Sequence, residues 1–146
     1  MTDRRVQPPA DGDEAPRHST ALGGPAGLDL VALATAICDR YRQEFPDEQE
    51  RYGDAGVAWC LHDNQYLLNW AAESVSGDLD LKQEVAWLAT ILEARDFPTD
   101  RLARDLDIGA DVVIGRVGGQ DGRELAAVLV DAAGFVRSGD FRDYTV

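Results

Sequence analysis

Residues 59–66 carry the side chains best suited to chemistry. The run Trp-Cys-Leu-His-Asp-Asn-Gln-Tyr contains His62, the one histidine beyond the N-terminal segment, directly before Asp63. Spacings of three and four residues bring side chains to one face of a helix. They therefore predict a ligand-binding face with aromatic walls and one acid, formed by Trp59, His62, Asp63, Tyr66 and Trp70. The alternative is that these aromatic rings fill the core and that Asp63 pairs with an arginine.

Catalysis by His62 and Asp63 is the rival hypothesis, as a small enzyme or a cofactor-binding protein. No catalytic motif accompanies the two residues, so we expect a protein that is not an enzyme, without catalytic residues. Haem ligation by His62 requires an apolar surrounding, whereas the next residues are Asp63 and Asn64. A zinc site needs three or four ligands, and Cys60 and His62 diverge by roughly 200° on a helix. We therefore expect no metal and no cofactor.

Two further patterns receive no chemical role. Residues 115–122 are rich in glycine and precede a predicted helix, but no strand comes before them and no lysine follows. They predict a flexible connector, not a phosphate-binding loop. The acidic pairs Asp47-Glu48 and Asp105/Asp107 are interpreted as solvent-exposed faces.

The apolar spacing predicts an all-α domain over residues 28–146, with five to six helices in a bundle or a globin-like arrangement. The expected helices span residues 28–44, 54–76, 78 or 80 to 95, 99–113 and 121–136. Thr99 is expected as an N-cap, and Asp121 with Glu124 as a capping box. Residues 45–53 are expected to form a connection, either without regular structure or with one helical turn at 47–50. The second of these is apolar around most of its circumference, which indicates a central helix. Val112–Ile114 is β-branched, but no partner strand is expected for it.

Residues 1–27 predict a disordered tail. They hold four of the six prolines together with several glycines, a composition that buries too little apolar surface to fold. Cys38 and Cys60 lie inside apolar helical patterns, where two buried reduced thiols are favoured over a disulfide.

The charge balance narrows the classes of partner. The chain has 14 basic and 27 acidic residues and a net charge of −13, which disfavours nucleic acid and anionic membrane surfaces. No signal peptide and no apolar run of about 18 residues is present, so a cytoplasmic location is expected. Arginine supplies 13 of the 14 basic residues, which is typical of high-GC actinobacteria.

Two segments carry a resemblance to known families: Arg40–Pro46, which ends the first helix, and Val85–Leu106, which gives a helix, a break and a further helix. They resemble the globin-like, non-haem N-terminal sensory domains of RsbR-type bacterial stress regulators, and are similar to the four-helix cap that precedes cobalamin-binding domains. The resemblance implies a free-standing sensor or adaptor. We expect a non-enzymatic regulatory module that acts through a protein partner or through a small molecule bound along the second helix.

Overall fold

The computed structural model describes residues 16–20, 22 and 27–144, and within them the chain is almost entirely helical. The helices are α1 (Leu30–Glu44), α2 (Asp47–Val75), α3 (Leu81–Ala94), α4 (Thr99–Arg116) and α5 (Gly119–Ser138), followed by the 3₁₀ helix η2 (Asp140–Asp143). The predicted all-α fold is confirmed. None of the helices in the described ranges has a continuous apolar stretch of the length that crossing a bilayer requires.

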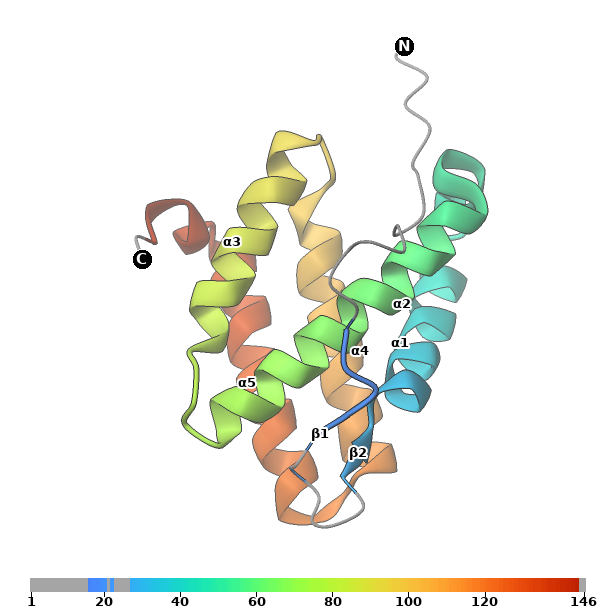
Figure 1. The fold of residues 1–146 in the computed structure, drawn as a ribbon. Helices are drawn as coiled ribbons and strands as arrows, with labels where there is room; N and C mark the ends of the chain where they lie inside the picture. The colour runs from blue at the N-terminus through green and yellow to red at the C-terminus, as the bar shows by residue number, and fades with distance from the viewer. Residues whose placement is uncertain (1–15, 21, 23–26, 145–146) are drawn as a thin grey trace.

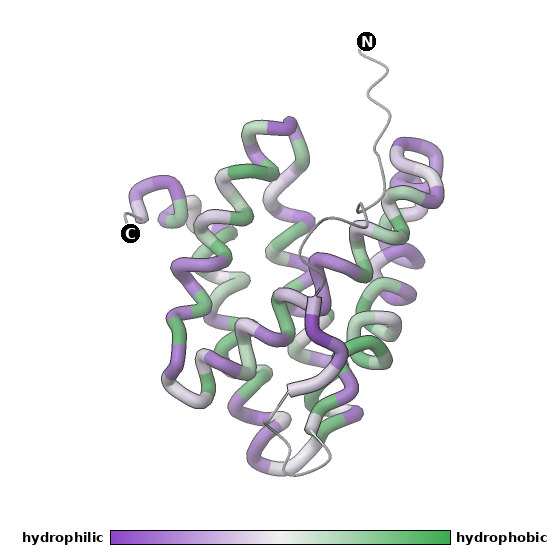
Figure 2. Tube along the Cα trace, viewed as in Figure 1, coloured by the Kyte–Doolittle hydropathy of each residue, from purple (hydrophilic) through white to green (hydrophobic). Residues whose placement is uncertain are grey.

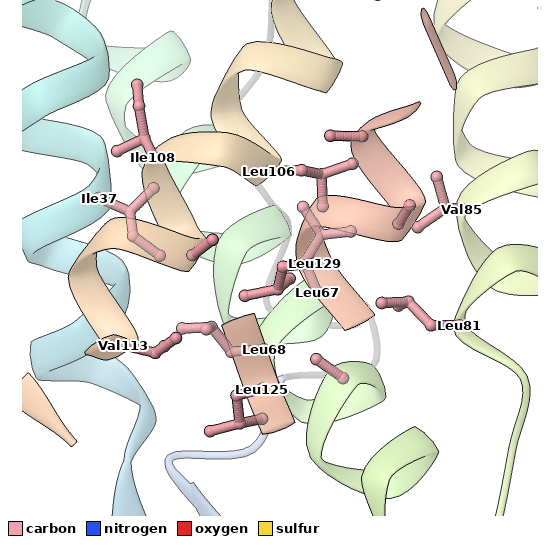
Figure 3. Close-up of a cluster of buried hydrophobic side chains, with 14 of the residues drawn as sticks. Ile37, Leu67, Leu68, Leu81, Val85, Leu106, Ile108, Val113, Leu125 and Leu129 are labelled. Atoms are coloured by element: carbon pink, nitrogen blue, oxygen red, sulfur yellow. The ribbon is translucent and has the colours of Figure 1, made fainter. Parts of the chain in front are cut away.

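Helix α2 runs across the pair formed by α4 and α5, with α1 on one side and α3 on the other (Figure 1). Apolar residues recur at intervals along each helix instead of gathering in one segment (Figure 2). The intervals place them in one shared core, to which all five helices contribute. Its centre is shown in Figure 3 and includes Ile37, Leu67, Leu68, Val85, Leu106, Leu125 and Leu129.

Two aspartates begin helices as capping residues. Asp29 Oδ1 accepts a hydrogen bond from the Ala32 amide at 3.0 Å, and Asp80 Oδ1 accepts one from the Lys82 amide at 3.0 Å. Each bond satisfies an amide that has no partner within its own helix. The fourth helix differs from the prediction, because Pro98 occupies the capping position and Thr99 is the first helical residue.

Helix α2 is longer than predicted. Residues 47–52, expected within a connection, form its first turns, and the helix bends at Gly53, where φ is 60° and ψ is −152°. These angles are essentially restricted to glycine. The proline and the acidic residues of this segment were compatible with a connection, but Asp47, Glu48 and Glu50 also suit the first turn of a helix.

The connection between α4 and α5 is shorter than the predicted loop 115–122. Helix α4 continues to Arg116 and α5 begins at Gly119, so the predicted start at Asp121 is wrong. Gly118, with φ of 67°, makes the turn, and a Cβ atom on Gly122 would lie 3.0 Å from the carbonyl oxygen of Val113. The glycines therefore serve a tight turn and a close approach between helices. Val112 and Val113 are buried within α4, as expected for a helix.

A short strand pair lies beside the start of α1. Strand β1 (Ser19–Thr20) pairs antiparallel with β2 (Leu28–Asp29), so α1 begins at Leu30 and not at the predicted Leu28. The carbonyl oxygen of Arg17 accepts a hydrogen bond from Gln65 Nε2 of α2 at 3.1 Å. The rest of the segment 1–27 predicted as a disordered tail, residues 1–15, 21 and 23–26, lies outside the described residues.

Candidate functional site on helix α2

Four rings follow one another along α2 and form what we call the aromatic row: Trp59, His62, Tyr66 and Trp70. Their centroids are separated by 5.0 Å between Trp59 and His62, 5.0 Å between His62 and Tyr66, and 5.6 Å between Tyr66 and Trp70. The helical spacing of three and four residues brings the rings together. Sequence reasoning selected these four residues as a ligand-binding face, and ligand binding itself stays a prediction.

The aromatic row lies at the edge of the core. All four rings are half-buried, and Trp70 packs against the core residues. The alternative that the rings fill the interior describes Trp70 in part, because this ring packs against the core while it keeps some exposed surface. Asp63, also selected from the sequence, lies beside the row, and its Oδ1 atom is 3.1 Å from Nδ1 of His62. Among the described residues it pairs with no arginine.

Two hollows on the described surface lie away from the aromatic row. One is a crevice of about 10 Å³ bordered by residues of α1 and the first half of α2, including Tyr41, Glu48, Gly53 and Cys60. The other is an open groove of about 620 Å³ between the start of α1 and residues 116–121. No residue of the row and no atom of Asp63 lines either hollow. The row is thus a surface suited to contact, not the wall of one of these hollows.

A second feature, which sequence reasoning missed, is a buried polar cluster made by Cys38, Cys60, Asn64 and Asp105. The exposed fraction is 4% for Asn64 and 7% for Asp105. Asn64 Nδ2 lies 3.2 Å from Asp105 Oδ1, 3.0 Å from the carbonyl oxygen of Cys60, 3.5 Å from Cys60 Sγ and 3.6 Å from Cys38 Sγ. The asparagine therefore joins α1, α2 and α4.

The position of Asp105 corrects the interpretation of Asp105/Asp107 as a solvent-exposed face. Asp105 is buried, because it lies on the same side of α4 as the buried residues Leu102 and Ile108, three residues before it and three after it. Only Asp107 is accessible, and it accepts a hydrogen bond from Arg137 at 2.8 Å. The spacing of Leu102, Asp105 and Ile108 is the available signal, since residues three and four apart share a helix face.

Burial raises the pKa of Asp105 to about 7, and the hydrogen bond from Asn64 opposes the rise. The nearby charges of Asp63 and Glu48 raise this pKa further. A hydrogen bond with Cys38, together with burial, raises the pKa of the Cys60 thiol, which therefore stays protonated. Cys38 and Cys60 are free thiols. A protonated, buried thiol is a poor nucleophile, so the cluster is suited to holding a proton more than to covalent chemistry.

The other predicted acidic face, Asp47-Glu48, is bound to Arg101. The Arg101 guanidinium donates to Asp47 Oδ1 at 3.1 Å and to Glu48 Oε2 at 2.9 Å. Glu48 also accepts a hydrogen bond of 2.6 Å from the Tyr41 hydroxyl, whose pKa is raised by burial and which therefore remains a donor. These bonds fix the start of α2 against α1 and α4.

Within the described ranges, no three histidine, cysteine, aspartate or glutamate side chains are grouped so that they could hold a metal ion. Comparisons with protein-family models, with curated proteins and with solved structures found no match for this chain. No residue of the site therefore takes a role from a relative.

Proposed function

We propose that this chain is a non-enzymatic regulatory module that binds a partner polypeptide through the aromatic row of α2. The observation that carries the proposal is the contact series of Trp59, His62, Tyr66 and Trp70 at the edge of the core. Tryptophan and tyrosine are the residues most often responsible for binding energy at protein interfaces. A row of four rings along one helix offers a binding strip of the kind that an extended or helical segment contacts.

The surroundings of the row favour a polypeptide with basic side chains over a small molecule. A drug-sized ligand takes most of its binding energy from a concave pocket, and the row does not line either of the described hollows. Asp63, with 34% of its side chain exposed, stands next to the rings. A lysine or arginine of a partner would contact both the carboxylate and the face of a neighbouring ring. The net charge of −13 also attracts a basic partner.

Two sequence-based expectations complete the proposal. The resemblance of residues 40–46 and 85–106 to RsbR-type sensory domains supports a regulatory role, exercised in the cytoplasm. The rival, a small enzyme that uses His62 and Asp63, has the 3.1 Å contact between these side chains in its favour. A reaction also requires a site that encloses its substrate, and neither described hollow is lined by the pair.

The proposal is tested by selecting peptides from a random-peptide phage library on the folded full chain and measuring their affinity by calorimetry. Selected peptides should be rich in lysine or arginine. The substitution Trp59→Ala should weaken their binding by about 30-fold, because truncating an interface tryptophan commonly costs about 2 kcal/mol or more.

Trp87→Ala is the matched control. Trp87 is also a tryptophan but lies on α3 and is 57% exposed, so its removal should leave the affinity unchanged. Circular dichroism establishes that both variants keep the helical fold. If no peptide is enriched, or if the selected peptides bind the Trp59→Ala variant as tightly as the unaltered chain, the aromatic row is not the recognition surface.

A further inference from the structure

The buried polar cluster lies where three helices meet. Cys38 belongs to α1, Cys60 and Asn64 belong to α2, and Asp105 belongs to α4. The single side-chain amide of Asn64 reaches the carboxyl oxygen of Asp105 at 3.2 Å and both sulfur atoms within 3.6 Å. One carboxyl group and one amide therefore take part in the packing of α2 against α1 and α4, beside the apolar core.

No cation neutralises Asp105 within the described ranges, and its hydrogen-bond donor is the neutral amide of Asn64. The charged groups that act on it are negative, Asp63 and Glu48 of α2. From α1 the neutral phenol of Tyr41 and thiol of Cys38 lie nearby. Two arginines of α4 and α5 are paired with other carboxylates. Arg101 of α4 is bonded to Asp47 and Glu48, and Arg137 of α5 is bonded to Asp107 of α4.

The protonated and ionised forms of this carboxyl group differ greatly in the free energy required to bury them. A neutral carboxyl is tolerated in the interior, whereas an unpaired carboxylate there must gain water or a counter-charge. Burial raises the pKa of Asp105 to about 7, so both forms are populated near neutral pH. A small change in pH therefore changes the charge at the junction of the three helices.

A small crevice borders the cluster at Cys60. The crevice of about 10 Å³ has room for about one water molecule, and Cys60 of the cluster is part of its lining. Gly53, where α2 bends, lines the same crevice. Residues 47–52 before the bend are held by Arg101 and Tyr41, while residues 54–75 after it carry Asn64. The bend separates the part of α2 bound to Arg101 and Tyr41 from the part that carries Asn64 and the core residues of this helix.

We propose that Asp105 and Asn64 form a proton-operated latch, which holds residues 54–75 of α2 against α1 and α4 while the carboxyl group is neutral and loosens them when it ionises. Ionisation brings a carboxylate into a site that already faces Asp63 and Glu48, and the repulsion is relieved by admitting water from the crevice. The latch is a regulatory device of the fold, and it operates whether or not the aromatic row binds a partner.

Amide hydrogen exchange of the full chain, followed by mass spectrometry, measures the latch. Protection factors of residues 54–75, corrected for the intrinsic pH dependence of exchange, should fall about tenfold or more between about pH 6 and about pH 8.5. In Asp105→Asn, a neutral side chain of nearly the same shape, the protection should not change with pH. In Asp107→Asn, which alters the accessible neighbour bonded to Arg137, the tenfold fall should persist.

A second measurement keeps the test decisive where Asp105→Asn does not fold. The ¹³Cγ signal of Asp105 in the unaltered chain should titrate near neutral pH, over the same range in which the protection falls. Each of three results would overturn the latch. The protection could be independent of pH in the unaltered chain, the fall in protection could persist in Asp105→Asn, or the Asp105 carboxyl group could remain ionised down to about pH 5.

Discussion

Asp105 is 7% exposed and lies where three helices meet. The protonation of its carboxyl group should govern how the stability of the fold depends on pH. Its pKa is raised from 3.8 to about 7 in the folded chain. Between these two values the folded state keeps a proton that the unfolded chain releases. The free energy of unfolding should therefore fall as the pH rises through this window, by at most about 1.4 kcal/mol per pH unit.

Urea unfolding of the unaltered chain and of Asp105→Asn between about pH 4 and about pH 8 checks this prediction. Other carboxyl groups act in the opposite direction at lower pH: Glu44, whose pKa is lowered by the hydrogen bond from Arg104, loses its partner as the pH falls. The difference between the two proteins isolates Asp105. It should shift in favour of Asp105→Asn as the pH rises, and a constant difference would show that Asp105 is ionised throughout.

Single residues also show where sequence reasoning reaches its limit. His62, Asp63 and the three aromatic residues of the row could be selected because their types and spacing are visible in the chain. The sequence predicts Asp105 at the surface, because charged residues are rarely buried. That general preference counts for more in the prediction than the apolar residues on the same face of the helix. Its hydrogen-bond donor Asn64 comes from α2, and Cys38, which Asn64 contacts, comes from α1. The meeting of these residues therefore depends on packing that no local pattern contains.

At the scale of the element, α2 is the helix whose packing most directly supports the site. Leu67 is 2% exposed and lies in the core among the side chains labelled in Figure 3. Leu67→Ala should lower the free energy of unfolding by about 2–5 kcal/mol, because the substitution loses apolar burial and leaves a cavity. Ile114→Ala, at a position 54% exposed on α4, is the control and should change stability by less than about 0.5 kcal/mol in the same urea titration. Equal effects would contradict the central position of α2.

The bend in α2 predicts that substitution of its glycine by alanine lowers the stability of the fold, whereas the same substitution within the regular helix α5 raises it. Gly53→Ala should destabilise the chain by about 1–3 kcal/mol, because φ of 60° with ψ of −152° suits only glycine, although no atom lies within 4 Å of the added Cβ. Gly134→Ala also meets open space but lies within regular α5, where alanine should stabilise by about 0.4–1 kcal/mol. Thermal unfolding measures both, and a stabilising Gly53→Ala would mean that α2 is straight.

A helix boundary is predictable where a side chain marks it, as at Asp80, one of the two predicted starts of the third helix. Asp29 caps α1 in the same way, but the predicted start at residue 28 lies before this cap. The glycine-rich segment 115–122 was interpreted as a loop, since glycine usually interrupts helices. Gly122 is instead required where α5 approaches the Val113 carbonyl oxygen, a reason that exists only in the packed structure.

At the scale of the whole molecule, the periodic apolar residues were sufficient to predict one helical domain, because each helix buries one face in a shared core. The periodicity did not predict the route of α2 across α4 and α5 (Figure 1). That route leaves one face of α2 at the edge of the core, where the aromatic row lies. The arrangement of whole helices thus explains why the four rings of the row are half-buried while Leu67 and Leu68 of the same helix are buried.

The three tryptophans allow the central claim, recognition through the aromatic row, to be measured in one experiment. Trp59 and Trp70 belong to the row, and Trp87 lies on α3. The full chain, labelled with ¹⁵N at tryptophan, gives one indole Nε1–H signal for each residue and is titrated with a peptide selected on the folded protein. The account predicts that the signals of Trp59 and Trp70 move with a common dissociation constant while that of Trp87 stays in place. Saturating binding that moves Trp87 alone, or none of the three signals, would contradict it.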